Sequence, residues 1–209
     1  AKTDVKYTVN KYFMNTDGNY EGVEADPETL YGETGEEVTY VPAAVEGFTF
    51  DATQANKLTG TVAGDGSLEL TVYYSRNKVN VTINDKTEEK YYGETIDEPA
   101  APAEPEGEKF VGWVDEDDQP VKFPVTVGTE DIVIKPDFEP IEYTVEFIVE
   151  GMDEAYATGK YAHGTTIVTP KDPDVAGFTF KGWAKTEGGE IVDPETMTVP
   201  VNGITFYAI

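Results

Sequence analysis

Apolar and polar residues alternate along six runs of this chain. Val, Ile, Thr, Tyr and Phe dominate these runs, and the polar residues between them are typical of half-buried antiparallel β-strands. Three of the runs open a segment and three close one: 7–13, 79–83 and 143–148 open, and 68–74, 132–138 and 204–209 close. Helical periodicity is scarce, and its clearest case is a short turn capped by Asp193 with Pro194 at the first helical position. The pattern predicts a mainly β protein.

Glycine landmarks repeat along the chain in step with these runs. A Gly-x-Thr phrase begins at Gly32, Gly93 and Gly164, after intervals of 61 and 71 residues. Each phrase is followed 13 to 15 residues later by a glycine that opens an aromatic strand, and these glycines are Gly47, Gly107 and Gly177. A long period repeated at several landmarks indicates that one folding unit has been copied in tandem.

We therefore expect three tandem repeats, residues 1–77, 78–140 and 141–209, with almost no linker between them. Each repeat is expected to be a small, twisted, mostly antiparallel sheet with little helix and one crossing segment. Residues 99–105 carry three prolines, which cannot continue an ordinary helix, so they are expected to be an extended crossing. A repeat of this size is near the lower limit for an independent core, so neighbouring repeats are expected to support one another.

Composition narrows the classes of function. The chain has no cysteine, which excludes disulfides, thiolate zinc sites and a cysteine nucleophile. The net charge of −26 divides over the three repeats as −8, −11 and −7, and a field of this sign repels nucleic acid. No apolar run reaches the length of a membrane span, so no membrane insertion is expected. The chain starts at Ala1 without a signal peptide and stops inside a predicted strand, so it reads as a piece of a longer protein.

The phrases of the last two repeats resemble the internalin-type B repeat, a bacterial surface module. Residues 161–166, 177–183 and 205–208 carry the Tyr/Phe-Gly-x-Thr, Gly-Phe-x-Phe-x-Gly-Trp and Thr-Phe-Tyr-Ala phrases of that family. Residues 92–95 and 110–113 repeat the first two phrases, although Pro136 interrupts the matching last strand. The repeat 141–209 lacks the family's terminal tryptophan. The repeat 1–77 lacks the Gly-Trp pair, and its closing run resembles mucin-binding-protein repeats instead.

This resemblance implies a β-grasp-like fold in each repeat, within the α+β class, and an elongated array of repeats. It also implies a place in a secreted or cell-wall protein on the surface of a Gram-positive bacterium. The family supplies no catalytic residues and no cofactor, and its members serve as spacers or in adhesion. The expected molecule is thus a monomeric, non-catalytic segment, and its partners would be host or bacterial surface proteins or glycans.

Few residues offer chemistry of their own. The single histidine, His163, lies at a predicted strand end without an evident catalytic partner, so we interpret it as a loop residue. Residues 115–118 are all acidic and could hold a hard cation such as calcium, but they lack a spaced calcium loop and read as a solvated hairpin turn. Lys11 and Asn77 lie on the first and last strands of one repeat, as an isopeptide pair would, without an identifiable buried acid.

Aromatic residues are the remaining candidates for binding. Trp113 and Trp183 fall at matching places, and a core role is favoured over a sugar platform because large rings fill small cores. Strand alternation predicts that one tyrosine of each adjacent pair faces solvent, and the candidate contact residues are therefore Tyr73, Tyr74, Tyr91 and Tyr92. Two functions stay open: a spacer and interaction module, or an adhesin segment that binds a host glycan or protein directly.

Overall fold

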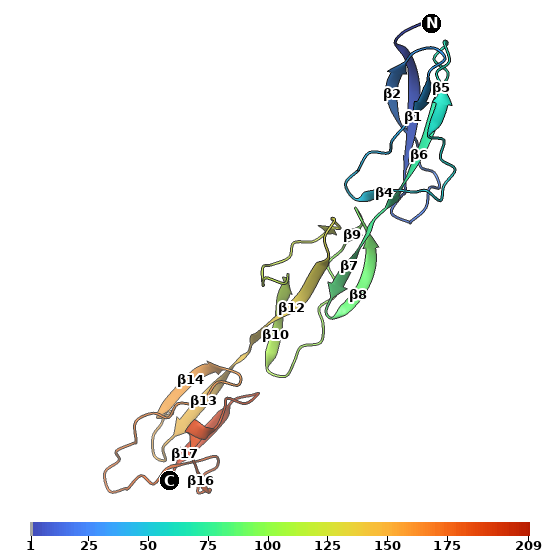
Figure 1. The fold of residues 1–209 in the computed structure, drawn as a ribbon. Helices are drawn as coiled ribbons and strands as arrows, with labels where there is room; N and C mark the ends of the chain where they lie inside the picture. The colour runs from blue at the N-terminus through green and yellow to red at the C-terminus, as the bar shows by residue number, and fades with distance from the viewer. Residues whose placement is uncertain (1) are drawn as a thin grey trace. The chain divides into compact units, whose positions relative to one another are not determined.

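The computed structural model describes residues 2–209, and the described chain consists of β-strands, turns and one short 3₁₀ helix (Figure 1). The strands are β1 (Val5–Phe13), β2 (Asp26–Gly32), β3 (Glu37–Thr39), β4 (Phe48–Phe50), β5 (Thr59–Thr61), β6 (Glu69–Arg76), β7 (Lys78–Ile83), β8 (Lys86–Tyr91), β9 (Thr95–Ile96), β10 (Glu108–Val114), β11 (Val125–Thr126), β12 (Ile132–Pro140), β13 (Glu142–Ile148), β14 (Ala157–Ala162), β15 (Trp183–Ala184), β16 (Ile191–Val192) and β17 (Ile204–Ala208). The helix, η1, covers Pro194–Thr196, and the Asp193 carboxylate accepts a hydrogen bond from the Glu195 N–H, as a capping residue should. The predicted mainly β fold is confirmed.

The chain forms two compact units. The first contains Ala1–Pro99 and Val114–Lys135, and the second contains Ala100–Trp113 and Pro136–Ile209. Strand β12 contributes to both, because its first residues pair with β7 in the first unit while Phe138 packs against Phe110 of β10 in the second. Residues 99–105 contain no helix or strand, as the prolines predicted.

An opening strand and a closing strand lie side by side in each of the three larger sheets. These central pairs are parallel: β1 with β6, β7 with β12, and β13 with β17. The flanking strand pairs, such as β1 with β2 and β13 with β14, are antiparallel. Because parallel neighbours cannot be joined by a tight hairpin, the chain must cross between them through the long segments that carry the glycine landmarks.

Three clusters of buried side chains form the core. One lies between Val5 and Tyr74, a second between Val79 and Val127, and a third between Val145 and Phe206. One cluster therefore falls within each predicted repeat. Both tryptophans are buried, and Trp183 packs in the third cluster against Phe147 and Phe180, so their predicted core role is confirmed.

A left-handed glycine begins the crossing segment in each repeat. Gly93 and Gly164 have φ angles of 82° and 78°, and each donates its N–H to the carbonyl of a buried valine, Val127 or Val199. In the first repeat Gly35, with φ 87°, makes this bond to Val62. The Gly-x-Thr phrase at Gly32 is thus three residues out of step with the other two, because Gly32 is the last residue of β2 and Gly35 makes the turn.

Candidate interaction site at the repeat junctions

Strand β6 runs into β7 through one residue, Asn77, at the boundary between the first two predicted repeats. The Asn77 N–H donates to the Gly47 carbonyl at 2.9 Å, and the Asn77 carbonyl accepts the Tyr92 N–H at 2.8 Å. The Tyr92 ring lies on the Cα of Gly47, so closely that a Cβ added to Gly47 would overlap it. A main-chain ladder and a side-chain contact therefore join the two repeats inside the first unit.

Arg76, the last residue of β6, reinforces this boundary. Its Nη1 donates to the Tyr92 carbonyl at 2.6 Å, and its Nε donates to the Met14 carbonyl at 2.8 Å. The guanidinium also lies 4.8 Å from the centre of the Phe48 ring, which meets Tyr92 edge-on with centroids 5.8 Å apart. A cation over a ring contributes about 0.5–2 kcal/mol. Arg76 thus binds main-chain carbonyls and an aromatic ring around the junction.

The second boundary, inside the second unit, is built in the same way. The Ile141 N–H donates to the Gly107 carbonyl at 2.8 Å, and the His163 N–H donates to the Ile141 carbonyl at 2.8 Å. Here the His163 imidazole takes the place of the Tyr92 ring and lies on Gly107. Its Nδ1 is buried, and residues 2–209 offer it no hydrogen-bond partner. His163 is therefore a packing residue of the junction rather than a plain loop residue.

Glycine is required on the receiving side for two reasons. Gly47 and Gly107 have φ angles of 76° and 77°, in the left-handed region that side chains other than glycine rarely adopt. Both are buried beneath a ring that leaves no room for a Cβ. We call this arrangement of strand bond, buried glycine and covering ring the ring-on-glycine junction.

The four tyrosines predicted as contact residues have other surroundings. Tyr74 is 1% exposed and stacks on Phe13 in the core, while Tyr73 stacks on Tyr12. Tyr92 lies in the junction, and the Lys78 ammonium covers the Tyr91 ring at 4.8 Å. The expectation that one member of each pair faces solvent is therefore wrong. Neighbouring aromatic and basic side chains cover the outer member as well, so none of the four is fully exposed.

Other aromatic residues are exposed instead. Tyr31 on β2 is 65% exposed and Tyr161 on β14 is 44% exposed, and both strands are edges of their sheets. Phe178 is 82% exposed in the second unit. The sequence carried a signal for Tyr31, since it alternates with Leu30, which packs against the core.

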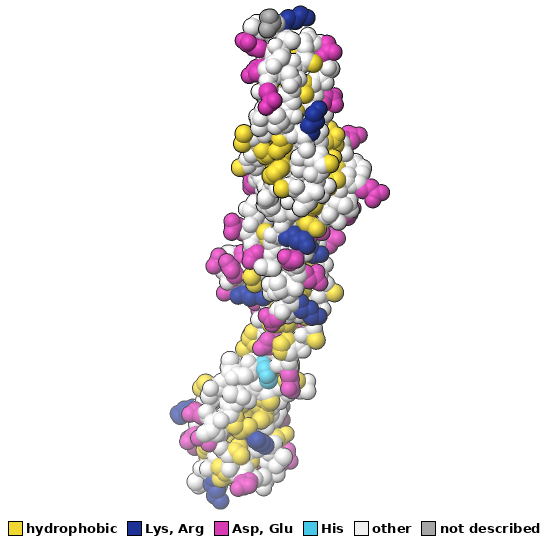
Figure 2. Space-filling view, turned by 45° about the vertical axis from the view of Figure 1, so that its right-hand side comes forward, with side chains coloured by type: hydrophobic (Ala, Val, Ile, Leu, Met, Phe, Trp, Pro, Cys, Tyr) yellow, Lys and Arg dark blue, Asp and Glu magenta, His cyan; other side chains and the backbone are white. Residues whose placement is uncertain are grey.

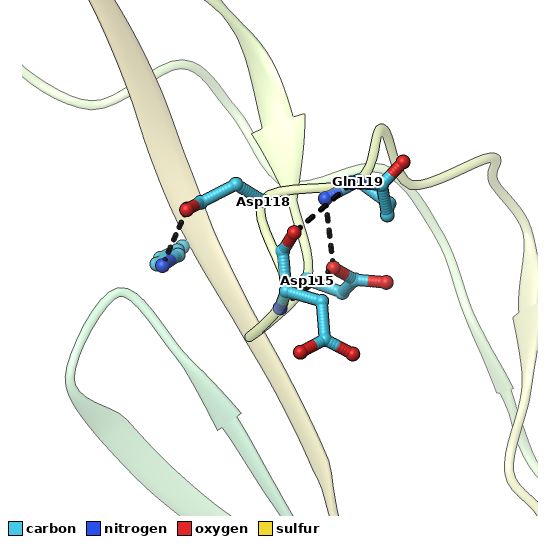
Figure 3. A network of polar contacts seen from close by, with 5 residues as sticks. Asp115, Asp118 and Gln119 are labelled. Carbon is cyan, nitrogen blue, oxygen red and sulfur yellow. Dashed lines mark hydrogen bonds and ion pairs between the residues drawn. The ribbon is translucent and has the colours of Figure 1, made fainter.

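The acidic residues 115–118 form a tight turn after β10 (Figure 3). The Asp115 carboxylate accepts the backbone N–H groups of Asp117 and Gln119 at 3.0 and 2.8 Å, and Asp118 pairs with Lys135 at 2.7 Å. The predicted turn is present, and the Asp115 carboxylate is used in hydrogen bonds within the turn. Across residues 2–209 no group of three His, Cys, Asp or Glu residues is placed to hold a metal ion.

Asp51 is the buried acid of the described chain, at 9% exposure. It accepts hydrogen bonds from the Thr53 hydroxyl and from the Tyr20 hydroxyl, at 2.5 and 2.9 Å. These bonds, led by that of the Thr53 hydroxyl, hold the pKa of Asp51 below its ordinary value. Burial, followed by the bond to Asp51, raises the pKa of Tyr20 well above its ordinary value. This pair anchors the loop after β4.

The side chains of Lys11 and Asn77 contact different partners. Lys11 forms ion pairs with Asp26 and Glu28 at 3.4 and 3.7 Å, and the Asn77 side chain accepts the Thr49 hydroxyl at 2.7 Å. Elsewhere on the surface, acidic side chains greatly outnumber basic ones and are scattered among small hydrophobic patches (Figure 2). Charge is thus dispersed over the visible face and does not gather at one site.

The sequence profile of the Listeria-Bacteroides repeat domain matches two segments of the chain, residues 71–134 and 143–209. The chain belongs to this family. It is also 29% identical, over 97% of its length, to a provisionally named membrane protein of Evansella cellulosilytica. A second, provisionally named Gly-rich membrane protein of that organism is 28% identical over the same share. The chain spans 32% and 26% of the length of these two relatives. Within residues 2–209, no helix has the length and apolarity needed to cross a membrane.

Proposed function

We propose that this chain is a non-catalytic tandem-repeat segment of a bacterial cell-surface or secreted protein, where it serves as a spacer and protein-interaction module. Membership of a bacterial repeat family and the names of two longer relatives support a surface location. The observation that carries the proposal is the ring-on-glycine junction, which recurs at both predicted boundaries with the same main-chain bonds.

The repeats of this proposal are residues 1–77, 78–140 and 141–209. The last two are proposed to be of the internalin B type and the first to be closer to mucin-binding-protein repeats. Their shared geometry supports a common plan, since each has a left-handed glycine bonded to a buried valine and a central parallel strand pair.

A spacer must resist bending where its repeats meet. Flexible linkers rich in glycine and serine behave as random coils, and such a linker would defeat the purpose. At the first junction one residue separates β6 from β7, and this residue is bonded on both sides. Bending there would break these bonds and expose Gly47, so the junction favours one angle between the two repeats.

Spin-label distances test this rigidity in the first unit. The chain has no native cysteine, so Thr29→Cys on β2 and Glu88→Cys on β8, both exposed, can be labelled selectively. A narrow distance distribution is expected, and Tyr92→Ala should broaden it because the covering ring is lost. Tyr161→Ala removes an exposed tyrosine from the other unit and should leave the distribution unchanged. A native distribution as broad as that of Tyr92→Ala would overturn the spacer function.

The alternative function is an adhesin segment that binds a host glycan or protein. It is favoured by Tyr31 and Tyr161, which are exposed on edge strands where a partner could stack or add a strand. Tyr73 and Tyr91 are half-buried and would offer a partner less aromatic surface than Tyr31 and Tyr161 do. A glycan and host-protein array decides between the two functions: binding that is lost in Tyr31→Ala or Tyr161→Ala would favour the adhesin.

A further inference from the structure

The turn at Gly177 has the geometry of the two glycines that receive a ring. In all three turns the residue after the glycine donates its N–H to the carbonyl of the residue two positions before the glycine. These bonds join Phe48 to Val45 at 3.0 Å, Glu108 to Pro105 at 3.1 Å, and Phe178 to Val175 at 3.1 Å. The φ angle of Gly177 is 85°, against 76° and 77° for Gly47 and Gly107. The third repeat therefore carries the receiving half of a ring-on-glycine junction.

Nothing among the described residues covers this third turn. Gly47 and Gly107 are buried, whereas Gly177 is exposed and has no atom of residues 2–209 within 4 Å of an added Cβ. Phe178 occupies the place of Phe48, yet it is 82% exposed, while Phe48 is packed by Tyr92 and Arg76.

The segment that follows this turn also lacks a neighbouring strand. Phe48–Phe50 forms β4 and pairs with the end of β6, but residues 178–180 lie outside the described strands. The antiparallel pairing along β17 reaches Lys181, whose N–H donates to the Ile209 carbonyl. Beyond that point a hollow of about 710 Å³ opens, and its apolar lining includes Val149, Val175, Phe178, Phe180, Ala208 and Ile209.

We propose that the Gly177–Phe178 face is a docking surface for a further repeat of the same family. The incoming repeat lays an extended segment beside Phe178–Phe180, donates an N–H to the Gly177 carbonyl, and places a tyrosine or histidine ring on Gly177. The two junctions already formed within the chain supply this pattern. The inference goes beyond a spacer function, because it assigns a surface and the class of partner that fits it.

Charge favours a repeat on the same polypeptide over a free second copy. Two molecules of net charge −26 repel each other, which disfavours their association in trans. A repeat on the same polypeptide is held close to the docking surface, and its high effective concentration there offsets this repulsion. The relatives are also long enough for further segments, since the chain spans only 32% and 26% of their length.

Strand register defines how a further repeat should be attached. Ile204 pairs with Val145 as Ile132 pairs with Val81, so Ile209 corresponds to Asp137. A second copy of residues 138–209, fused directly after Ile209, therefore continues the strand in register. In this extended chain the appended copy of Ile141 reaches Gly177, and the appended copy of His163 covers it.

Hydrogen exchange of the Thr179 amide measures the docking, because its counterpart Thr49 pairs with Ser75 of the neighbouring strand, whereas the Phe178 N–H is already bonded to the Val175 carbonyl. This amide should exchange at least about tenfold more slowly in the extended chain than in the original one.

The protection should be lost in Gly177→Ala and when His163→Gly is made in the appended copy. Gly164→Ala in the original copy is the matched control, because Gly164 has a φ of 78° and equally open space but does not line the hollow beside Gly177.

Equal exchange in both chains would overturn the proposal, and so would an appended copy that stays unprotected, since the same residues fold in the original chain. Protection that appears in the original chain as its concentration rises would show that a free second copy is the occupant, and would also overturn it. The spin-label measurement in the first unit is independent of Gly177, so failure here leaves the spacer function standing.

Discussion

At the scale of single residues, Asp51 tests how a buried acid stabilises a loop. Asp51→Asn removes the charge that accepts the Thr53 and Tyr20 hydroxyl hydrogen bonds, and we expect a loss of about 1–3 kcal/mol in the free energy of unfolding at pH 7. Denaturant unfolding of the native chain and the variant measures this loss. Asp65→Asn is the control, since Asp65 is exposed and bonds only within its own turn.

The same residue predicts a dependence on pH. Because the pKa of Asp51 is lowered by folding, its stabilisation is complete above the ordinary value of about 3.9 and is lost as the pH falls through the folded-state pKa. The difference in stability between the native chain and Asp51→Asn should therefore shrink below about pH 4. A difference that stays constant down to pH 2 would show that the charge is not its source.

Some residue roles were readable from the sequence and others were not. The burial of Trp113 and Trp183 followed from their matched positions and their size. The roles of His163 and Tyr92 did not, because they depend on which glycine of the preceding repeat lies beneath each ring. That pairing joins residues 45 and 56 positions apart in the chain, and no local pattern records it.

At the scale of elements, alternation predicted the opening and closing strands but not how they pair. Parallel and antiparallel neighbours both require a period of two, so the central parallel pairs could not be read from alternation. Turn position could be predicted where the chemistry was local. The cap at Asp193 and the acidic turn at residues 115–118 are examples, since each is made by bonds within a few residues.

Strand β17 offers a test of its central position. Phe206 is fully buried and stacks on Phe147 of the neighbouring parallel strand with centroids 5.3 Å apart. Phe206→Ala should lower the stability of the second unit by about 3–5 kcal/mol, because it removes a large ring and leaves a cavity. Thr205→Ala, whose side chain points to the other face, should cost much less. Thermal unfolding followed by near-ultraviolet circular dichroism compares them, and equal losses would contradict this packing.

At the scale of the whole molecule, the sequence period and the compact units divide the chain differently. The period predicts three repeats, whereas the contacts within the fold divide the residues into two compact units. The boundary between these units falls inside β12. The reason is physical: β12 is long enough to pair with β7 at its start and to pack against β10 at its end. A repeated sequence thus need not fold into equally separate bodies.

Net charge gives a prediction for the whole chain. The chain has 41 acidic and 15 basic residues, so repulsion between carboxylates opposes folding. Added salt should weaken this repulsion. Raising NaCl from about 0.01 M to about 0.1 M shortens the Debye length from about 30 Å to about 10 Å. We therefore expect the melting temperature at pH 7 to rise by several degrees, since about 1 kcal/mol corresponds to about 2–4 °C at this size.

Near pH 4.1, where the net charge approaches zero, the rise should disappear. NaCl is preferable to sulfate, which strengthens apolar burial by itself. An equal rise at both pH values would mean that salt acts through something other than the repulsion of carboxylates.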